Sequence, residues 1–377
     1  MNVSLRREEF ASLPGWADDA PAAALAAFCR SARHVAENGP YKTGSLGLSA
    51  EGFKPGYDAA LTLQATESGL VSEGEARAFF EKWFRPVRID VDDGAGFVTG
   101  YYEPELEVTA TADSDHAFPF LRKPDNLVKV PDPDDPLVGI PDGYAFMLEQ
   151  NGEGSVCPDR QAIETGAFRG QGLEIAWAGS RADVFFAHVQ GCARLAFPDG
   201  RNRRITYAAK SGHPFTGIGG LLVERGEIAA SDISMAAIRQ WLAANPQHAD
   251  QLMWQNRSFI FFREADVDDP RLGPVAAAKV PLEPGRSLAV DRHIHTFGTP
   301  FFIDAPDLAD FDADRPFARL MIAQDTGTAI VGATRGDLFA GSGPVAGDKA
   351  GAIRNKASFT LLAPAGSQCA RRAGHER

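Results

Sequence analysis

The chain has 377 residues, of which 44% are hydrophobic and 23% are charged, and its formal net charge is −12. This balance excludes a wholly disordered or collagen-like chain, and the length corresponds to two or three domains of about 150 residues each. The acidic excess argues against a nucleic-acid partner, which needs a basic surface, and no apolar run approaches the ~20 residues of a transmembrane helix.

The first third of the chain is predicted to be helical. Pro21 precedes an Ala-rich amphipathic run that continues to His34, and Gly39 closes this run. Ser72 and Glu75 have the spacing of a capping box ahead of a second run. The apolar residues of this second run share one helical face: Ala76, Phe79, Phe80 and Trp83.

The pattern then changes to that of β-structure. Residues 97–109 are rich in Val and Tyr and alternate as a strand does. Over the next hundred residues, Pro and Gly separate short apolar runs such as Leu173–Trp177 and Val184–Val189. This predicts an all-β region of short strands, with exposed loops at residues 132–136 and 152–154.

Helices are predicted again at residues 218–225 and 234–245, where Ser234 is a candidate N-cap. After Phe262 the chain returns to strand-like runs, up to a polar end from about Gly366. The order helices, β region, helices, β region indicates two β-rich lobes. A cleft at the boundary between lobes is the default place for a ligand.

The cysteines and histidines give no recognisable metal motif. The four cysteines are far apart in the sequence: Cys29, Cys157, Cys192 and Cys369. Since they form no CxxC pair, they signal neither zinc binding nor thioredoxin-type chemistry, and free, partly buried thiols are expected. His293 and His295 alternate on a predicted strand without a third ligand in a recognisable frame. We expect no metal and no cofactor.

Three aspartates are the strongest candidates for chemistry. Each lies at the edge of an apolar run: Asp291, Asp325 and Asp337. Strand-end aspartates in one β region can converge on one site, but Asp near Gly is also common turn chemistry, so catalytic and structural roles both stay open on spacing alone. Aromatic residues near Gly-rich segments could stack on sugar rings or belong to the core. These are Tyr101, Tyr102, Trp177 and Phe215.

Six motifs then occur in a fixed order. They are FVTGYYEP at 97–104, FFAHVQG at 185–191, YAAKSGHP at 207–214, ISMAAIRQW at 233–241, SFIFF at 258–262, and the stretch that contains Asp325 and Asp337. In this order and spacing they closely resemble the membrane-bound lytic murein transglycosylase A family. The segment FASLPGW at 10–16 also resembles the start of that family's mature domain. The resemblance covers nearly the whole chain.

The resemblance implies a mainly β protein with flanking helices and two domains. Residues 1–102 and 267–377 would form a double-psi β-barrel domain with N-terminal helices and the three-aspartate module. Residues 103–266 would form an inserted, smaller β-barrel domain that binds substrate. A deep groove would lie between the two domains.

The resemblance also implies a reaction. Family members cleave the β-1,4 bond between N-acetylmuramic acid and N-acetylglucosamine in peptidoglycan, and they form a 1,6-anhydromuramic product without water. Ordinary glycosidases use two carboxyl groups. Here the C6 hydroxyl of the sugar is the nucleophile, so one carboxyl group can act first as acid and then as base.

The roles of the three aspartates follow from their positions in the family's module. Asp337 matches the catalytic acid. Asp325 matches the preceding aspartate and has a supporting catalytic role, through hydrogen bonding or positioning. Asp291 matches the first aspartate and has a structural role. The substrate-binding positions carried over within the motifs are Tyr101, Tyr102, Gln190, Gly191, Lys210, His213 and Gly327.

Two matched segments depart from the family pattern. Gln190-Gly191-Cys192-Ala193-Arg194 stands for Gln-Gly-Ser-Gly-Arg, and Thr328 stands for the second glycine of Asp-x-Gly-Gly-Ala-Ile. These changes are expected to narrow the groove or to change substrate preference. A non-catalytic peptidoglycan-binding module is therefore one alternative. A glycoside hydrolase that uses Asp325 and Asp337 with water is another.

The resemblance implies peptidoglycan glycan strands as the partner, with other cell-wall enzymes as further candidates and no nucleic acid. It also implies a periplasmic protein that is associated with the outer membrane. However, the first ten residues are polar and show neither the apolar core of a signal peptide nor a lipobox. Taken alone, they predict a cytoplasmic protein or a chain whose targeting segment is missing.

Overall fold

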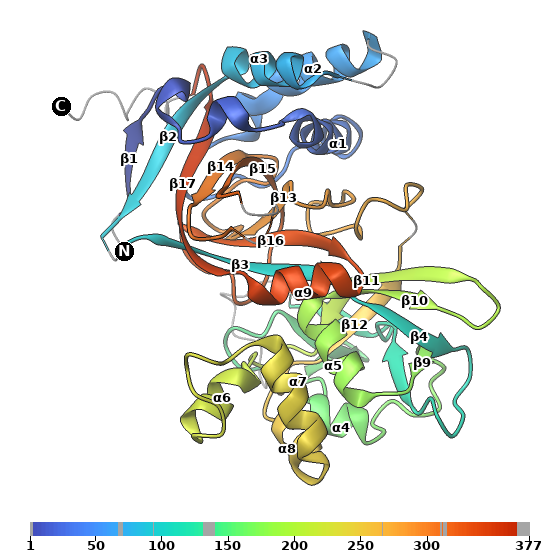
Figure 1. Ribbon diagram of the computed structural model, residues 1–377. Coiled ribbons are helices and arrows are strands. Elements are labelled where there is room, and N and C mark those ends of the chain that lie inside the picture. Colours follow the sequence, from blue (N-terminus) through green and yellow to red (C-terminus); the bar gives the residue numbers. More distant parts are fainter. Residues whose placement is uncertain are drawn as a thin grey trace. The chain divides into compact units, whose positions relative to one another are not determined.

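The backbone divides into two compact units. The first unit consists of Met1–Tyr102 and Val267–Arg377, and the second of Glu103–Asp266. Each unit has its own strands, which pair within that unit (Figure 1). Each unit also has its own cluster of buried hydrophobic residues. The prediction of a sheet-rich chain with helices is confirmed. The computed structural model describes residues 3–66, 71–92, 94–130, 140–265, 267–309, 311 and 315–367.

The N-terminal helices of the first unit begin and end where local signals predict. Helix α1 (Ala22–Asn38) follows Pro21, and Gly39 with a φ of 91° ends it. Helix α3 (Glu73–Trp83) carries the predicted capping box, because Ser72 and Glu75 each accept a hydrogen bond from the other's amide. Helix α2 (Ala50–Thr66) lies in the third of the chain predicted to be helical, but no separate helical run is assigned to it; it contains a proline, which usually interrupts a helix.

The strands of the first unit close into a ring. They are β1 (Val3–Arg7), β2 (Phe84–Val91), β3 (Gly96–Glu103), β13 (Ser287–Val290), β14 (Pro300–Ala305), β15 (Phe317–Asp325), β16 (Arg335–Ser342) and β17 (Arg354–Pro364). Their order is β1-β2-β17-β14-β15-β13-β16-β3, and β17 also pairs with β3. The strands from β17 to β3 therefore form a closed circuit, which removes free edges there.

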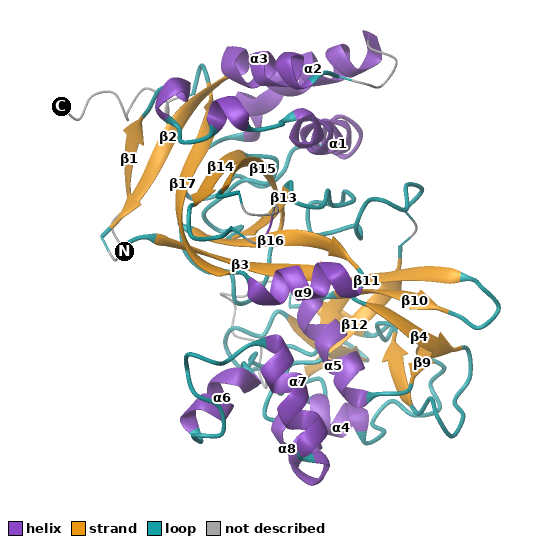
Figure 2. Ribbon diagram, in the orientation of Figure 1, coloured by secondary structure: helices purple, strands orange, loops and turns teal. Residues whose placement is uncertain are grey.

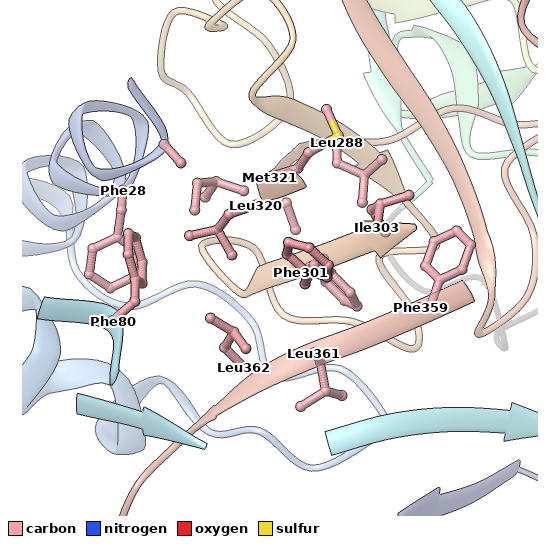
Figure 3. Close-up of a cluster of buried hydrophobic side chains, with 14 of the residues drawn as sticks. Phe28, Phe80, Leu288, Phe301, Ile303, Leu320, Met321, Phe359, Leu361 and Leu362 are labelled. Carbon is pink, nitrogen blue, oxygen red and sulfur yellow. The ribbon is translucent and has the colours of Figure 1, made fainter. Parts of the chain in front are cut away.

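The core of the first unit joins this ring to the helices (Figure 3). Phe28 of α1 and Phe80 of α3 meet edge to face, with ring centroids 6.0 Å apart. Fully burying an aliphatic or aromatic side chain stabilises the fold by about 1.5–3 kcal/mol, so this cluster holds the helices against the strands. The labelled strand residues of the cluster are Leu288, Phe301, Ile303, Leu320, Met321, Phe359, Leu361 and Leu362.

The second unit is built from short strands and helices (Figure 2). Its strands are β4 (Glu105–Thr109), β5 (Phe118–Leu121), β6 (Leu127–Lys129), β7 (Phe146–Gln150), β8 (Glu153–Ser155), β9 (Glu174–Ala178), β10 (Cys192–Ala196), β11 (Asn202–Lys210) and β12 (Ile260–Glu264). One sheet has the order β12-β11-β10-β4-β9-β5, and another has the order β6-β7-β8. The helices are α4 (Arg160–Glu164), α5 (Arg181–Gln190), α6 (Ile218–Glu224), α7 (Met235–Ala244) and α8 (Pro246–Trp254).

The prediction of an all-β region up to residue 207 is wrong at α4 and α5. Val184–Val189, predicted as a strand, lies inside α5. Ser180 caps this helix by accepting a hydrogen bond from the Asp183 amide, and Gly191 ends it in the left-handed conformation with a φ of 76°. A short continuous apolar run does not alternate, so its periodicity cannot separate a buried strand from a buried helix.

Other predictions along the chain have mixed outcomes. The strand at 97–109 is confirmed with a break at Pro104, between β3 and β4. Helices α6 and α7 are confirmed, and Ser234 caps α7 by accepting a hydrogen bond from the Ala237 amide. The strand-like C-terminal region is confirmed except for α9 (Pro344–Ala352). The exposed loop predicted at 152–154 is confirmed only in part: Gly152 is an exposed turn residue, whereas Glu153 and the half-buried Gly154 belong to strand β8. The loop predicted at 132–136 lies outside the described residues.

Cys29, Cys157 and Cys192 are buried, and Cys369 lies outside the described residues. Burial raises the pKa of Cys29 to about 11 and that of Cys157 to about 12. Within the part of the chain that the structure describes, no helix combines the length and the apolar character needed to cross a bilayer.

Candidate active site

The structure brings Asp325 and Asp337 together on either side of strand β13. Asp337, in β16, pairs with Ala289 across the antiparallel β13–β16 ladder. Asp325, the last residue of β15, pairs with the same Ala289 across the parallel β13–β15 ladder. Residues that face each other across adjacent strands project from the same face of a sheet. Both carboxyl groups therefore lie on one face of the ring.

Asp337 is held by residues from two strands. Thr99 of β3 donates a hydrogen bond from Oγ1 to Asp337 Oδ1 at 2.5 Å. Arg335, two residues before Asp337 in β16, donates from Nη2 to Thr99 Oγ1 at 2.7 Å. The Arg335 guanidinium also lies over the ring of Phe97, 5.6 Å from its centroid. Thr99 thus connects the guanidinium to the carboxyl group.

The surroundings shift Asp337 toward its protonated form. Burial raises the pKa of Asp337 to about 6, against the hydrogen bond from Thr99 and the charge of Arg335, and the neighbouring Asp325 adds to the rise. Asp337 still keeps part of its surface accessible to solvent. A carboxyl group with a pKa near 6 can both give and take a proton near neutral pH.

Asp325 is held by the backbone. Its Oδ1 accepts hydrogen bonds from the amides of Thr326 at 2.9 Å and Ala277 at 3.2 Å. Burial raises its pKa, whereas those two amides, a hydrogen bond from Tyr101 and the charge of Lys279 lower it. The two aspartates thus have different partners: the Thr99 hydroxyl group on Asp337, and two backbone amides together with Tyr101 on Asp325.

Asp291 follows β13 and joins two loops. Its Oδ1 accepts a hydrogen bond from the His293 amide and its Oδ2 accepts one from the Gly332 amide, each at 3.0 Å. The carboxylate therefore fastens the turn after β13 to the loop before β16. The predicted strand through His293 and His295 is wrong, because these residues lie in turns. His295 is buried, and its Nε2 donates to the Ala333 carbonyl oxygen at 2.8 Å.

Three predicted substrate-binding residues lie in the first unit. Tyr101 is buried and packs against Phe339, with ring centroids 5.3 Å apart, in a cluster that also contains Ala289. Tyr102 is buried beside α9, where a Cβ atom added at Gly347 would lie 2.8 Å from its ring. Gly327 is exposed in the loop that follows Asp325, as is its neighbour Thr328.

The other predicted substrate-binding residues lie in the second unit. Gln190 ends α5, and the carbonyl oxygen of Gly191 accepts a hydrogen bond from the Tyr207 amide at 2.8 Å. Lys210 is the last residue of β11. His213 is buried, with Nδ1 2.9 Å from the Tyr144 hydroxyl and Nε2 2.7 Å from the Cys157 carbonyl oxygen. Both of its ring nitrogens therefore have partners inside this unit.

The two residues of the segment 190–194 that differ from the family pattern, Cys192 and Ala193, are both buried. Cys192 is buried, and its Sγ lies 3.8 Å from the Gln190 carbonyl oxygen. Ala193 is fully buried in the core of the second unit. The methyl group that distinguishes Ala193 from glycine is therefore accommodated by core packing.

Thr99 and Arg335 are site residues that the sequence interpretation missed. Arg335 and Asp337 are two residues apart in one strand, as are Thr99 and Tyr101 in another, and side chains at this spacing share a face. This period of two was available in the sequence. The pairing of β3 next to β16 was not.

Among the described residues, no three His, Cys, Asp or Glu side chains are grouped so that they could hold a metal ion.

Two family models match the chain. The MltA specific insert domain matches residues 97–263, and the 3D domain matches residues 286–363. Among curated proteins, the membrane-bound lytic murein transglycosylase A of Vibrio cholerae is 33% identical over 261 residues. That match covers 67% of this chain and 61% of the relative. The chain therefore spans about three fifths of the length of this relative.

Solved structures are similar over nearly the whole chain. A membrane-bound lytic murein transglycosylase from Agrobacterium tumefaciens is 49% identical, with a TM-score of 0.90, and the match covers 98% of this chain and 99% of that one. The structure of Escherichia coli MltA with bound chitohexaose is 26% identical, with a TM-score of 0.64 and coverage of 90% and 89%.

Proposed function

The chain belongs to the membrane-bound lytic murein transglycosylase A family, and on this premise we propose that it cleaves the β-1,4 bond between N-acetylmuramic acid and N-acetylglucosamine in peptidoglycan. The product is a 1,6-anhydromuramic end, and no water is consumed. The resemblance found in the sequence is confirmed at the level of the family. The cleavage chemistry and the role of each aspartate are the proposal.

One observation carries this proposal: burial beside Asp325 raises the pKa of Asp337 to about 6. In the first step, protonated Asp337 gives its proton to the glycosidic oxygen while the bond from C1 to that oxygen breaks. In the second, the Asp337 carboxylate takes the proton of the C6 hydroxyl as O6 bonds to C1. Asp337 ends protonated, so a single carboxyl group completes the cycle.

Asp325 has the supporting role. Its negative charge favours the protonated form of Asp337. When ionised, it also favours the positive charge that develops on the sugar ring in glycosidic cleavage. Asp291 is a structural residue, because both of its carboxylate oxygens accept hydrogen bonds from loop amides.

We propose further that the closed circuit of strands from β17 to β3 is a double-psi β-barrel. The second unit would be the inserted substrate-binding domain, with Gln190, Gly191, Lys210 and His213 as substrate-binding residues. The groove between the domains stays a prediction. So do the effects of Cys192 and Thr328 on substrate preference.

The proposed substrate is the glycan strand of peptidoglycan. Chitohexaose, bound in the Escherichia coli relative, is a β-1,4-linked polymer of N-acetylglucosamine and supports a glycan substrate. The relatives are named membrane-bound, and we place this protein in the periplasm in association with the outer membrane. Other cell-wall enzymes remain candidate partners.

The test is digestion of purified sacculi with the wild-type protein and with Asp337→Asn, followed by mass spectrometry of the muropeptides. Wild type should release species lighter by one water at the muramic end, and Asp337→Asn should lower their rate by about 10²–10⁴-fold, the usual contribution of a general acid–base. Asp304→Asn is the matched control, because burial also raises the pKa of Asp304, a half-buried carboxyl group in β14.

Each contrary result has a distinct meaning. Anhydro products from Asp337→Asn at the wild-type rate would remove Asp337 from the catalytic role. Free reducing ends would indicate hydrolysis by Asp325 and Asp337 with water. Sacculus binding by wild type without any product would indicate a binding module.

A further inference from the structure

Three helical segments of the second unit enclose a polar pocket that the candidate active site does not use. The C-cap of α6 and the turn after it contribute to the pocket together with α7 and α8, and the three helices lie together in Figure 1. Its volume is about 270 Å³. The lining residues are Arg225, Glu227, Trp241, His248, Gln251 and Gln255.

Local structure explains why these side chains converge. Arg225 is the C-cap of α6, and Gly226 takes a left-handed conformation with a φ of 71°, so the chain turns sharply between Arg225 and Glu227. On α8, the lining residues His248, Gln251 and Gln255 are three and four positions apart and therefore share one helical face.

The pocket stands on a packed base. Leu222, Leu242, Leu252 and Met253, which come from the same three helices, are buried in one hydrophobic cluster. Since this cluster fixes the three helices against one another, the rim of the pocket is largely preformed. A preformed site loses little conformational entropy when it binds a ligand.

The lining combines the indole of Trp241 and the imidazole of His248 with planar polar groups. Trp241 is partly exposed, and its Nε1 donates a hydrogen bond to Glu227 Oε2 at 3.2 Å, which orients the indole. In the described part of the chain, the Arg225 guanidinium makes no ion pair. None of the described residues that line the pocket is aliphatic. An indole face surrounded by guanidinium, carboxylate and amide groups suits a ring with an apolar face and hydroxyl groups at its edge.

Charge and size narrow the ligand further. The lining holds one guanidinium, one carboxylate, one imidazole and two neutral amide side chains. These described residues lack the cluster of cations that an acidic peptide would need, so the lining suits a neutral ligand better. The volume lies just below the ~300–1,000 Å³ of pockets that hold drug-sized molecules. One or two pyranose rings are therefore the appropriate size.

We propose that this pocket is an auxiliary glycan-binding site, which takes N-acetylated pyranose rings of the same strand that the enzyme cleaves. The identity of the glycan rests on the proposed function. A second site on one polymer raises the local concentration of the strand without any new contact at Asp337. The pocket would thus hold the enzyme on insoluble peptidoglycan between cuts.

The experiment titrates chitotriose into ¹⁵N-labelled Asp337→Asn protein, which suppresses turnover. The indole N–H signal of Trp241, assigned with Trp241→Phe, should move and saturate. Arg225→Ala and Gln251→Ala change exposed side chains and should each weaken this response by about fivefold to tenfold, because each loses a hydrogen bond worth roughly 1 kcal/mol. Gln240→Ala, an exposed glutamine on α7 outside the lining, is the control and should leave the response unchanged.

A Trp241 signal that stays fixed overturns the inference. So does an affinity for chitotriose in Arg225→Ala and Gln251→Ala that is unchanged from that of the parent Asp337→Asn protein. A response to a soluble acidic stem peptide in place of chitotriose overturns the glycan assignment. Sacculus digestion separates the two proposals. If anhydro products form but the Trp241 indole signal does not move, only the auxiliary site is ruled out. If the Trp241 signal moves but no product forms, only the proposed reaction is ruled out.

Discussion

Thr99 Oγ1 donates a hydrogen bond to Asp337 Oδ1 at 2.5 Å while it accepts one from Arg335 Nη2 at 2.7 Å. Thr99 therefore fixes one carboxyl oxygen of Asp337 and links it to the Arg335 guanidinium through a chain of two hydrogen bonds. In the described structure, Asp337 Oδ2 has no hydrogen-bond partner. This leaves Oδ2 available to carry the proton and to face a glycosidic oxygen.

The first prediction concerns the pH dependence of the wild-type enzyme. In the proposed mechanism cleavage needs protonated Asp337, whose pKa is about 6, so kcat/KM should fall about tenfold per pH unit above this value. Initial rates of anhydro product release from pH 4 to 9 give the profile. A flat profile from pH 5 to 8 would contradict the role of Asp337 as acid.

Thr99→Val should move the alkaline limb of this profile, the fall of kcat/KM above about pH 6, to higher pH. The hydrogen bond from Thr99 lowers the pKa of Asp337, so its loss lets the pKa rise. The maximal rate should also fall by about fivefold to tenfold, because the hydrogen bond that positions Asp337 is lost and such a bond contributes roughly 1 kcal/mol. Thr99→Ser keeps the hydroxyl group and should restore the wild-type limb. A limb that does not move in Thr99→Val would show that the hydrogen bond does not tune Asp337.

Asp325→Asn should move the same limb in the opposite direction. The charge of Asp325 raises the pKa of Asp337, so its removal lowers that pKa and the rate falls at a lower pH. Asparagine keeps an oxygen acceptor for the amides of Thr326 and Ala277, so the local backbone should be preserved. The same product-release profile measures the shift. A limb displaced toward higher pH would rule out charge coupling between the two aspartates.

His295 should make stability depend on pH. Burial lowers the pKa of His295 to about 4, from an ordinary value of 6.5. The unfolded chain therefore binds one more proton than the folded chain between these values, and the stabilisation present above pH 6.5 is lost as the pH falls to 4. The full loss is on the order of 3 kcal/mol. Thermal unfolding at several pH values measures it, and His295→Gln should flatten the decrease relative to wild type.

Phe80→Ala should destabilise the first unit without changing its chemistry. Phe80 is fully buried and packs edge to face on Phe28, so truncation leaves a cavity between α1 and α3. Replacing a buried Phe by Ala costs about 3–5 kcal/mol. Chemical denaturation measures the loss. Phe10→Ala, at a partly buried ring, should cost less, and equal losses in both variants would contradict a special role for the core.

Local signals in the sequence determined the helix ends correctly. The capping box of Ser72 and Glu75 and the N-cap at Ser234 are each made within three residues, so their spacing is visible in the chain itself. The ordered motifs likewise identified the family. Val184–Val189 shows the limit of this reasoning, because an apolar run can be buried in a helix or in a strand.

The sequence by itself determined which residue types are available for chemistry, above all Asp325 and Asp337. Only the tertiary structure decided that both lie beside Ala289, and that Thr99, 238 positions away from Asp337, is its hydrogen-bond donor. The physical reason is that a cap depends on neighbours within one helical turn, whereas the pKa of a carboxyl group depends on burial and on charges that strands β3, β13, β15 and β16 bring together when they pair.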